Sequence, residues 1–281
     1  MLLNDRRYMT DQLQHKTSAS GNDATLPAEF IAVCAFAFAA SVAGTVYFCR
    51  SMSGGMEMPG GWTMSMTWMR MPGQSWTASA AMFLLMWLTM MVAMMLPSLV
   101  PMLLRYRNAV DGGGETRLGP LTTLVTAGYF FVWTVFGVAV FATVTALAAV
   151  VMERPALARA VPIAVGVVVL LAGSLQLSEW KARHLVCCRE SPGRDRMMRA
   201  DVGTAWRHGL RLGFECAQCC VGLIAILLIM GVMDFRAMVV VAAAISAERL
   251  AQLGERVARA IGAVVVVAGL FLIARAAGLA G

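Results

Sequence analysis

Residues 82 to 97 read Met82-Phe-Leu-Leu-Met86-Trp-Leu-Thr-Met90-Met91-Val-Ala-Met94-Met95-Leu-Pro97, an almost uninterrupted apolar run. The run extends over residues 78–104, which exceeds the roughly 20 residues needed to cross a hydrocarbon core of about 30 Å. Lipid offers no hydrogen-bond partner to an exposed backbone, so a spanning segment of this kind must be helical. We therefore expect a transmembrane helix here.

Further long apolar runs follow along the rest of the chain. It has 281 residues, of which 59% are hydrophobic and only 14% charged. This composition is typical of a polytopic membrane protein. We predict an all-α membrane helix bundle of about seven transmembrane helices, with residues 27–281 forming a single domain. The predicted spans are 29–49, 78–104, 120–151, 161–178, 209–232, 236–249 and 258–279. The sixth is short, and a half-span or a re-entrant helix is the alternative for it.

The distribution of basic residues orients the predicted helices. Residues 1–26 are polar and contain no apolar signal segment, so we expect a disordered cytoplasmic tail. Seventeen of the 23 Lys and Arg residues fall on the same side as this tail. The positive-inside rule then places a Met-rich loop, 50–77, outside and a basic, Cys-containing loop, 179–208, inside. The same rule accounts for the net charge of +7 without a nucleic-acid partner.

The outer loop is the first candidate metal site. It contains three Met-x-Met pairs among Gly, Pro and Ser residues, and thioether sulfur is a soft ligand that suits Cu(I). The candidate ligands are Met52, Met56, Met58, Met64, Met66, Met69 and Met71. The alternative is an interfacial loop that places Met and Trp side chains among the lipid headgroups.

The second predicted span continues the methionine pattern. Met86, Met90 and Met94 follow Met82 at intervals of four residues, so they lie along one stripe of a helix. Such a stripe can pass Cu(I) from one thioether to the next. It can also be ordinary packing, because Met is a flexible side chain that fills gaps in cores.

Cysteines form the second candidate metal site. Cys216, Cys219 and Cys220 lie on one helical face near the predicted inner end of the fifth span, and Cys187 and Cys188 follow the fourth. With His184 they would form a site for Cu(I) or zinc, because both metals accept thiolate and imidazole ligands. The alternatives are a redox dithiol at Cys216 and Cys219, or cysteines that act only as small apolar residues.

Charged residues also lie near the inner ends of the predicted spans. Glu248 is expected near a membrane interface, where it is either solvated or paired, and Lys181 and Arg249 are its candidate partners. The chain has no nucleotide-binding loop and no Ser/His/Asp hydrolase pattern. The sequence therefore favours a role other than catalysis.

Several motifs together resemble a known family. They are Met86-Trp87-x-x-Met90-Met91-x-Ala93-Met94-Met95-Leu96-Pro97-Ser98, Ala127-Gly128-Tyr129-x-x-x-Trp133, Gln176 with Lys181, Gly209-x-x-x-Gly213-x-x-Cys216-x-x-Cys219-Cys220 and Ala247-Glu248-Arg249. The chain resembles a family of bacterial integral membrane proteins of unknown function that are described as metal-binding. The resemblance covers residues 50–250 and implies a multi-pass protein of the bacterial inner membrane. It departs at His184, where the family has Cys, and at Arg249, where Lys is frequent.

These observations predict a protein that binds a soft metal, most simply copper as Cu(I), for uptake, trafficking or delivery. Its partners would be the lipid bilayer, the metal ion, and a periplasmic or cytoplasmic metal chaperone or a cuproenzyme under assembly. Two alternatives stay open. One is a membrane thiol-disulfide oxidoreductase, and the other is an assembly partner that transports nothing.

Overall fold

The computed structural model describes residues 28–51, 54–58, 61–65, 73–110, 115–189, 201–251 and 253–278. The side chains of residues 65, 115–116 and 186–189 are not among those described. The predicted tail, 1–26, lies outside these ranges. The elements are α2 (Ala28–Ser51), β1 (Gly55–Met58), β2 (Trp62–Ser65), α3 (Trp76–Ala109), α4 (Glu115–Glu153), α5 (Pro155–Leu177), α6 (Glu179–Arg189), α7 (Val202–Met230), α8 (Phe235–Leu250) and α9 (Gly254–Ala276).

The predicted all-α helix bundle is confirmed. Six helices (α2, α3, α4, α5, α7 and α9) are long and apolar enough to cross a membrane, and they correspond to six of the seven predicted spans. The remaining prediction, 236–249, corresponds to α8, which has 16 residues. At 1.5 Å per residue this helix is about 24 Å long, less than the thickness of a hydrocarbon core.

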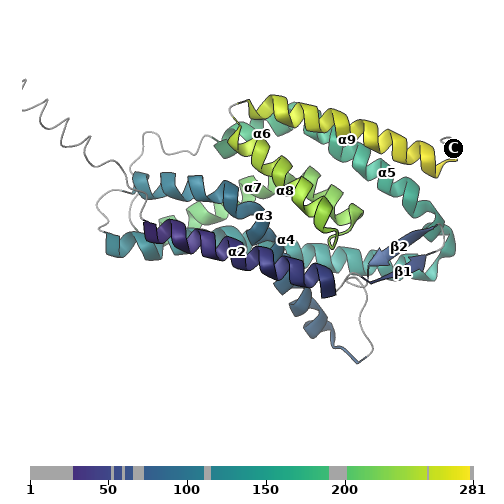
Figure 1. The fold of residues 1–281 in the computed structure, drawn as a ribbon, viewed down its shortest axis with the longest axis horizontal. Helices are drawn as coiled ribbons and strands as arrows, with labels where there is room; N and C mark the ends of the chain where they lie inside the picture. Colours follow the sequence, from purple (N-terminus) through teal and green to yellow (C-terminus); the bar gives the residue numbers. More distant parts are fainter. Residues whose placement is uncertain are drawn as a thin grey trace, which may run out of the picture.

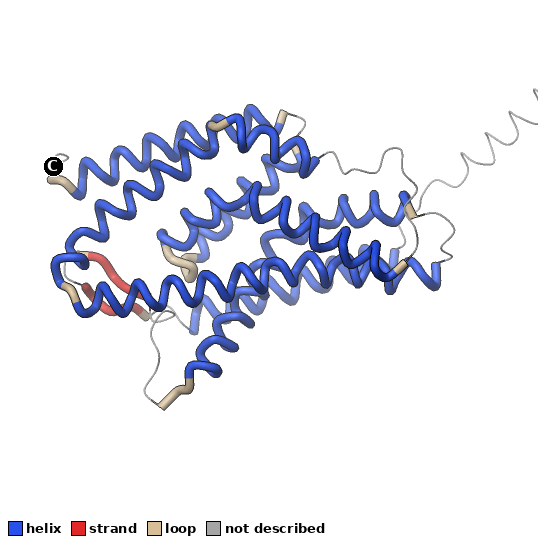
Figure 2. The backbone as a smooth tube through the Cα atoms, turned by 180° about the vertical axis from the view of Figure 1, so that it is seen from behind, coloured by secondary structure: helices blue, strands red, loops and turns tan. Residues whose placement is uncertain are grey.

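Consecutive long helices run in opposite directions (Figure 1), and α8 continues this alternation between α7 and α9. One end of the bundle carries the strands β1 and β2, and we call it the hairpin end. The other carries α6, and we call it the α6 end. Figure 2 shows the same arrangement from behind, with the red strands beside the junction of α4 and α5.

Two helices occupy the middle of the bundle. The spans in α3 and α7 are the most buried, while α2, α4, α5 and α9 present apolar side chains outward. Phe36 and Val264, for example, are 76% and 69% exposed, as expected of side chains that face lipid. The methionines of α3 and the cysteines of α7 therefore belong to the central pair of helices.

The segment from 179 to 208, which we expected to be a loop, is helical at both ends. The Ser178 hydroxyl accepts a hydrogen bond from the Lys181 backbone N–H at 3.3 Å, at the start of α6. The Asp201 carboxylate accepts one from the Thr204 backbone N–H at 2.8 Å and caps α7. Because of this cap, α7 begins seven residues before the predicted start of the fifth span.

Candidate metal centre

The three cysteines of α7 lie on one face, as predicted, and are buried near the middle of the helix. Cys216 is the fifteenth of 29 residues in α7. Its side chain has no exposed surface, and those of Cys219 and Cys220 are almost as deeply buried. We expected them near the end of the span, but the early start of α7 at Val202 places them deeper.

Cys216 is the centre of a group of sulfur atoms. Its Sγ atom lies 3.9 Å from the Met95 Sδ atom of α3 and 4.0 Å from the Cys220 Sγ atom. Met95 is completely buried. Thiols of two cysteines and one thioether thus meet between the two central helices.

A phenol from α4 completes this group. The Tyr129 hydroxyl donates a hydrogen bond of 2.9 Å to the Cys216 Sγ atom, and both side chains are fully buried. A hydrogen bond to a thiolate favours the deprotonated form, which is the form that binds metals. Tyr129 is therefore placed to stabilise a metal-bound Cys216.

Two glycines of α7 allow Tyr129 to approach. A Cβ atom at Gly213 would lie 2.8 Å from the Tyr129 carbonyl oxygen, and one at Gly209 would overlap the Val125 carbonyl oxygen. This Gly-x-x-x-Gly spacing lets helix backbones come into close contact in membranes. The same glycines were part of the sequence motif that precedes the cysteines.

Arg249 brings a positive charge to the sulfur group. Its Nη1 atom donates to the Ser98 hydroxyl at 3.2 Å, one residue after Pro97 in α3. The guanidinium is also within electrostatic range of the thiols of Cys216 and Cys220. Arg249 thus contributes a positive charge to the surroundings of both thiols.

A buried ion pair lies beside the same cysteines. The Lys181 Nζ atom is 2.8 Å from a Glu248 carboxylate oxygen, and each side chain is only 2% exposed. Glu248 also accepts a hydrogen bond from the Gln176 amide, and Lys181 donates one to the Cys219 carbonyl oxygen at 2.5 Å. Of the two pairings expected for Glu248, the structure has the one with Lys181.

The charge of Lys181 is maintained by its neighbours. Burial alone would lower the pKa of this ammonium, but the Cys219 thiol and the Glu248 carboxyl act in the opposite direction. The net result is a pKa raised above the ordinary value. Lys181 therefore stays protonated at neutral pH, and its charge is a fixed part of the centre.

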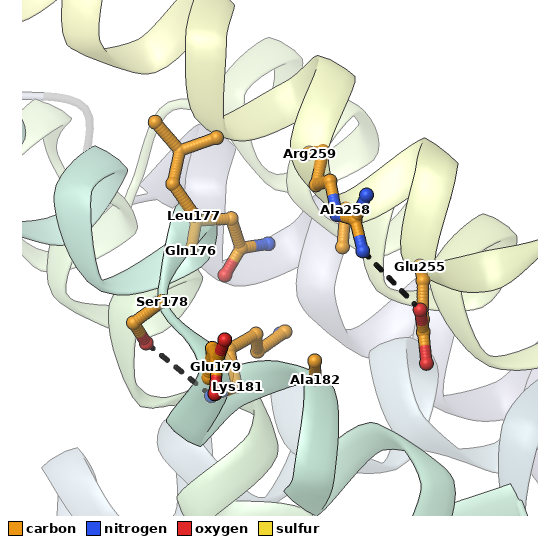
Figure 3. A pocket seen from close by; sticks show the side chains of 9 residues that line it. All are labelled: Gln176, Leu177, Ser178, Glu179, Lys181, Ala182, Glu255, Ala258 and Arg259. Carbon is orange, nitrogen blue, oxygen red and sulfur yellow. Dashed lines mark hydrogen bonds and ion pairs between the residues drawn. The ribbon is translucent and has the colours of Figure 1, made fainter.

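A cavity of about 200 Å³ at the α6 end is lined by Lys181 of this ion pair (Figure 3). Exposed Glu179 and Arg259 lie at its outer side, and buried Gln176 and Lys181 lie at its inner side. Arg259 pairs with Glu255 across one turn of α9 at 3.5 Å. The cavity thus gives the buried charges a polar route to the surface.

The outer methionines are only partly described. Met56 and Met64 are directly opposite each other in the antiparallel hairpin, and Met58 is opposite Trp62. Met64 is buried and Met56 is 43% exposed. The Trp62 indole donates to the Ala158 carbonyl oxygen of α5 at 2.9 Å, which fixes the hairpin to the bundle. Four predicted ligands, Met52, Met66, Met69 and Met71, lie outside the described residues.

The methionine stripe of α3 points into the bundle. Met86, Met90 and Met94 are each at most 3% exposed, whereas Met82 is 44% exposed. The stripe leads along α3 to Met95 and the Cys216 group.

The predicted ligands of α6 are not brought to the sulfur group by any described contact. The His184 ring lies against the Trp180 ring in a tilted arrangement, and its Nδ1 atom lies 2.8 Å from the Trp180 carbonyl oxygen. Cys187 and Cys188 lie in α6, with side chains outside the described residues. Among the described side chains, no three His, Cys, Asp or Glu residues converge as a metal-binding group, and the cysteines are free thiols. The group around Cys216 includes a thioether, from Met95, besides its thiols.

The family of the chain follows from a comparison with known proteins. A family model described as "PpoB2: Copper chaperone" matches residues 84–272, about two thirds of the chain. The chain belongs to the PpoB2 copper chaperone family. This agrees with the expected metal-related bacterial family. No curated protein and no solved structure matches the chain.

The part of the chain that matches the PpoB2 family contains the whole buried centre. Met95, Tyr129, Cys216 and Cys220 all lie within residues 84–272, as do the ion pair and Arg249. Helix α2 and the hairpin lie before the matched region. The family description therefore bears on the buried sulfur group more directly than on the outer methionines.

Met95 and Tyr129 were not among the site residues predicted from the sequence. Met95 was visible beside the predicted stripe, four residues after Met91, and Tyr129 was visible in its motif with Gly128. That both of them contact Cys216 depends on how α3 and α4 pack against α7. The spacing of Gly209 and Gly213 was the signal that α7 approaches another helix closely.

Proposed function

We propose that this protein is a membrane-embedded copper-binding protein that holds Cu(I) between Cys216, Cys220 and Met95 and delivers it to a protein partner. The observation that carries the proposal is the distance of the Met95 and Cys220 sulfurs from the Cys216 Sγ atom. The membership of the chain in a copper chaperone family supports the choice of metal.

The spacing suits a trigonal metal ion. Metal–thiolate bonds are about 2.3 Å long, so three sulfurs around one ion in a plane would be about 4.0 Å apart. The two sulfur–sulfur distances at Cys216 are 3.9 and 4.0 Å. These two distances match the separation expected around a trigonal ion. A thioether with two thiolates is a soft ligand set that favours Cu(I) over zinc.

The charges around the centre also suit this cargo. Among the described residues, the buried charged side chains are Lys181, Glu248 and Arg249, which together carry one positive charge. Two thiols that release two protons and bind one Cu(I) form a unit with one negative charge. The loaded centre is then neutral overall, which lowers the cost of holding it in a low-dielectric interior.

The path of the metal follows the sulfur atoms. We propose that the hairpin end faces outward, as the basic residues predict. Met56 and Met64 then belong to an outer capture site, and Met86, Met90 and Met94 form an intermediate route along α3. The cavity beside Lys181 lies at the opposite, cytoplasmic end, where α6 carries Cys187 and Cys188 as candidate acceptors.

The test is to measure copper binding by the purified full-length protein under anaerobic conditions. Cu(I) would be titrated against a competing chelator, and the sulfur ligands counted by X-ray absorption. We expect about three sulfurs at roughly 2.3 Å. The variants Cys216→Ser and Cys220→Ser should lose this ion, whereas Cys34→Ser, which alters a half-buried cysteine in α2, should retain it.

One result would contradict the proposal directly. If the Cys216→Ser variant bound the same number of Cu(I) ions with the same affinity as the natural protein, the buried centre would not be a copper site. Loss of a thiol-exchange activity in that variant at unchanged copper content would favour the redox alternative.

A further inference from the structure

We infer that Cys49 and Met238 form a second Cu(I) site, at the hairpin end of the bundle. The Cys49 Sγ atom of α2 lies 3.8 Å from the Met238 Sδ atom of α8. Met238 is only 4% exposed, and Cys49 is half-buried. A thiol and a thioether from helices far apart in the sequence thus meet where the bundle begins to open to the surface.

The distance between the sulfurs allows both to bind one ion. With bonds of about 2.3 Å, two sulfurs 3.8 Å apart would subtend an angle of roughly 110° at the metal. This angle leaves a coordination position open for a third donor. A site with two protein sulfurs and one open position suits an ion that is received and passed on, unlike the three-sulfur centre at Cys216.

A buried hydroxyl without a partner supports the site. Thr45 precedes Cys49 by one helical turn, so both lie on the same face of α2. Its side chain is 5% exposed, and its hydroxyl has no hydrogen-bond partner. Thr89 and Thr134 instead donate to the carbonyl four residues back, at 2.8 Å each. The Thr45 hydroxyl is therefore available to donate to a Cys49 thiolate.

A carboxylate lies near Cys49. Asp234 caps the start of α8, where its side chain accepts hydrogen bonds from the backbone N–H groups of Arg236 and Ala237. It is exposed and within electrostatic range of Cys49.

The site lies at the start of the methionine stripe. A Cβ atom at Gly44 would lie 2.9 Å from the Thr89 methyl group, so these residues are level in the antiparallel pair α2 and α3. Cys49, five residues later in α2, is then level with residues about five before Thr89, just ahead of Met86. Buried Met86, Met90 and Met94 therefore lie along α3 at levels between that of Cys49 and that of the Cys216 centre.

The role of this second site in copper delivery rests on the proposed function, but its binding of Cu(I) can be tested separately. The probe is Ag(I), a monovalent soft ion that stays in one oxidation state. The full-length protein is treated with a small alkylating reagent, and the modification rate of Cys49 is followed by mass spectrometry. We expect Ag(I) to slow alkylation of Cys49 at least tenfold in the natural protein and in a Cys216→Ser/Cys220→Ser variant.

The matched variants are Met238→Leu and Met82→Leu. Both conserve volume, but only the first removes the sulfur partner of Cys49. Protection of Cys49 should be lost in Met238→Leu and kept in Met82→Leu. Equal alkylation rates with and without Ag(I), or unchanged protection in Met238→Leu, would overturn the inference. Protection of Cys49 together with unaltered copper binding by the Cys216→Ser/Cys220→Ser variant would overturn the proposed function and leave this site standing.

Discussion

The Tyr129 hydroxyl and the Cys216 thiol form a buried hydrogen bond of 2.9 Å across the interface of α4 and α7. The bond joins two motifs that are 87 residues apart in the chain. It exists because two glycines of α7 let the helix backbones approach, and it holds the thiol in place beside Met95. A phenol is thus part of the buried sulfur group that we propose as the copper site.

The first prediction concerns this phenol. The Tyr129→Phe variant keeps the ring and removes the donor, so it should fold but hold a Cys216 thiolate less well. A hydrogen bond to a charged group contributes about 1.5–3 kcal/mol, which corresponds to a Cu(I) affinity at least tenfold lower. Competition with a Cu(I) chelator measures the Cu(I) affinity of the variant. Tyr47→Phe, at a side chain that is 69% exposed, is the control. Equal affinities of the two variants would show that Tyr129 is only a packing residue.

The second prediction concerns the thioether. In Met95→Leu the buried volume is nearly conserved, and such exchanges usually cost less than about 1.5 kcal/mol of stability. X-ray absorption of the copper-loaded variant should show two sulfur ligands in place of three. Met82→Leu should keep all three. An unchanged sulfur count in Met95→Leu would exclude Met95 as a ligand.

The third prediction concerns helix packing. A methyl group at Gly213 would press on the Tyr129 carbonyl oxygen, so Gly213→Ala should force α4 and α7 apart. Overpacking of this kind costs typically about 1–3 kcal/mol, and thermal unfolding should shift to lower temperature. Copper affinity should fall at the same time because Tyr129 and Cys216 separate. The control is Gly119→Ala, since a Cβ atom there meets no atom within 4 Å. A stable Gly213→Ala variant with full copper affinity would contradict the prediction.

The fourth prediction concerns the buried ion pair. In Glu248→Gln the Lys181 ammonium stays buried beside a neutral amide, and breaking one partner of such a pair costs about 3–5 kcal/mol. The double variant Lys181→Met/Glu248→Gln should recover most of this loss, because no buried charge is left without its partner. Chemical unfolding in detergent measures the free energy of unfolding of the single and the double variant. Equal destabilisation by the single and the double variant would show that the charge of Lys181 is not the cause.

The fifth prediction is the pH dependence of that pair. The pKa of Lys181 is raised above its ordinary value of 10.5, so its protonated form stabilises the fold. The contribution is fully present below 10.5 and is lost as the pH rises through the higher, folded-state pKa. The stability difference between the natural protein and the double variant Lys181→Met/Glu248→Gln, in which no carboxyl is left buried without its partner, should therefore stay constant from about pH 7 to about pH 9 and change as the solution becomes strongly alkaline. A change near neutral pH would contradict the raised pKa.

The apolar runs were sufficient to predict the bundle. Long helices in lipid must satisfy their own backbone, so composition and length decide their positions. The start of α7 was missed because Asp201, a short polar side chain that caps the helix, lies outside the apolar run. The strands β1 and β2 were missed for a similar reason, since their four-residue segments have no strong pattern among Gly, Pro and Met.

The site was predictable only in part. That Cys216 and Cys220 share a face follows from helical geometry. The pair of Glu248 with Lys181 was one of the options that the sequence left open, beside solvation and a pair with Arg249. That Met95 and Tyr129 are the neighbours of Cys216 depends on the relative rotation and depth of three helices. Packing between helices decides those quantities, and the sequence of one chain does not display them.

The hydrogen bond from Trp62 to the Ala158 carbonyl oxygen makes the hairpin a link between α2 and the helix pair α5 and α9. The hairpin follows α2 directly, whereas Ala158 belongs to the first turns of α5, which packs chiefly on α9. Any outward swing of α5 at that end must first break this indole bond. A ligand bound by both Met56 and Met64 would make the hairpin more rigid. Because the hairpin is hydrogen-bonded to α5, such binding at the surface would restrict the movement of α5 without involving the sulfur atoms of the interior.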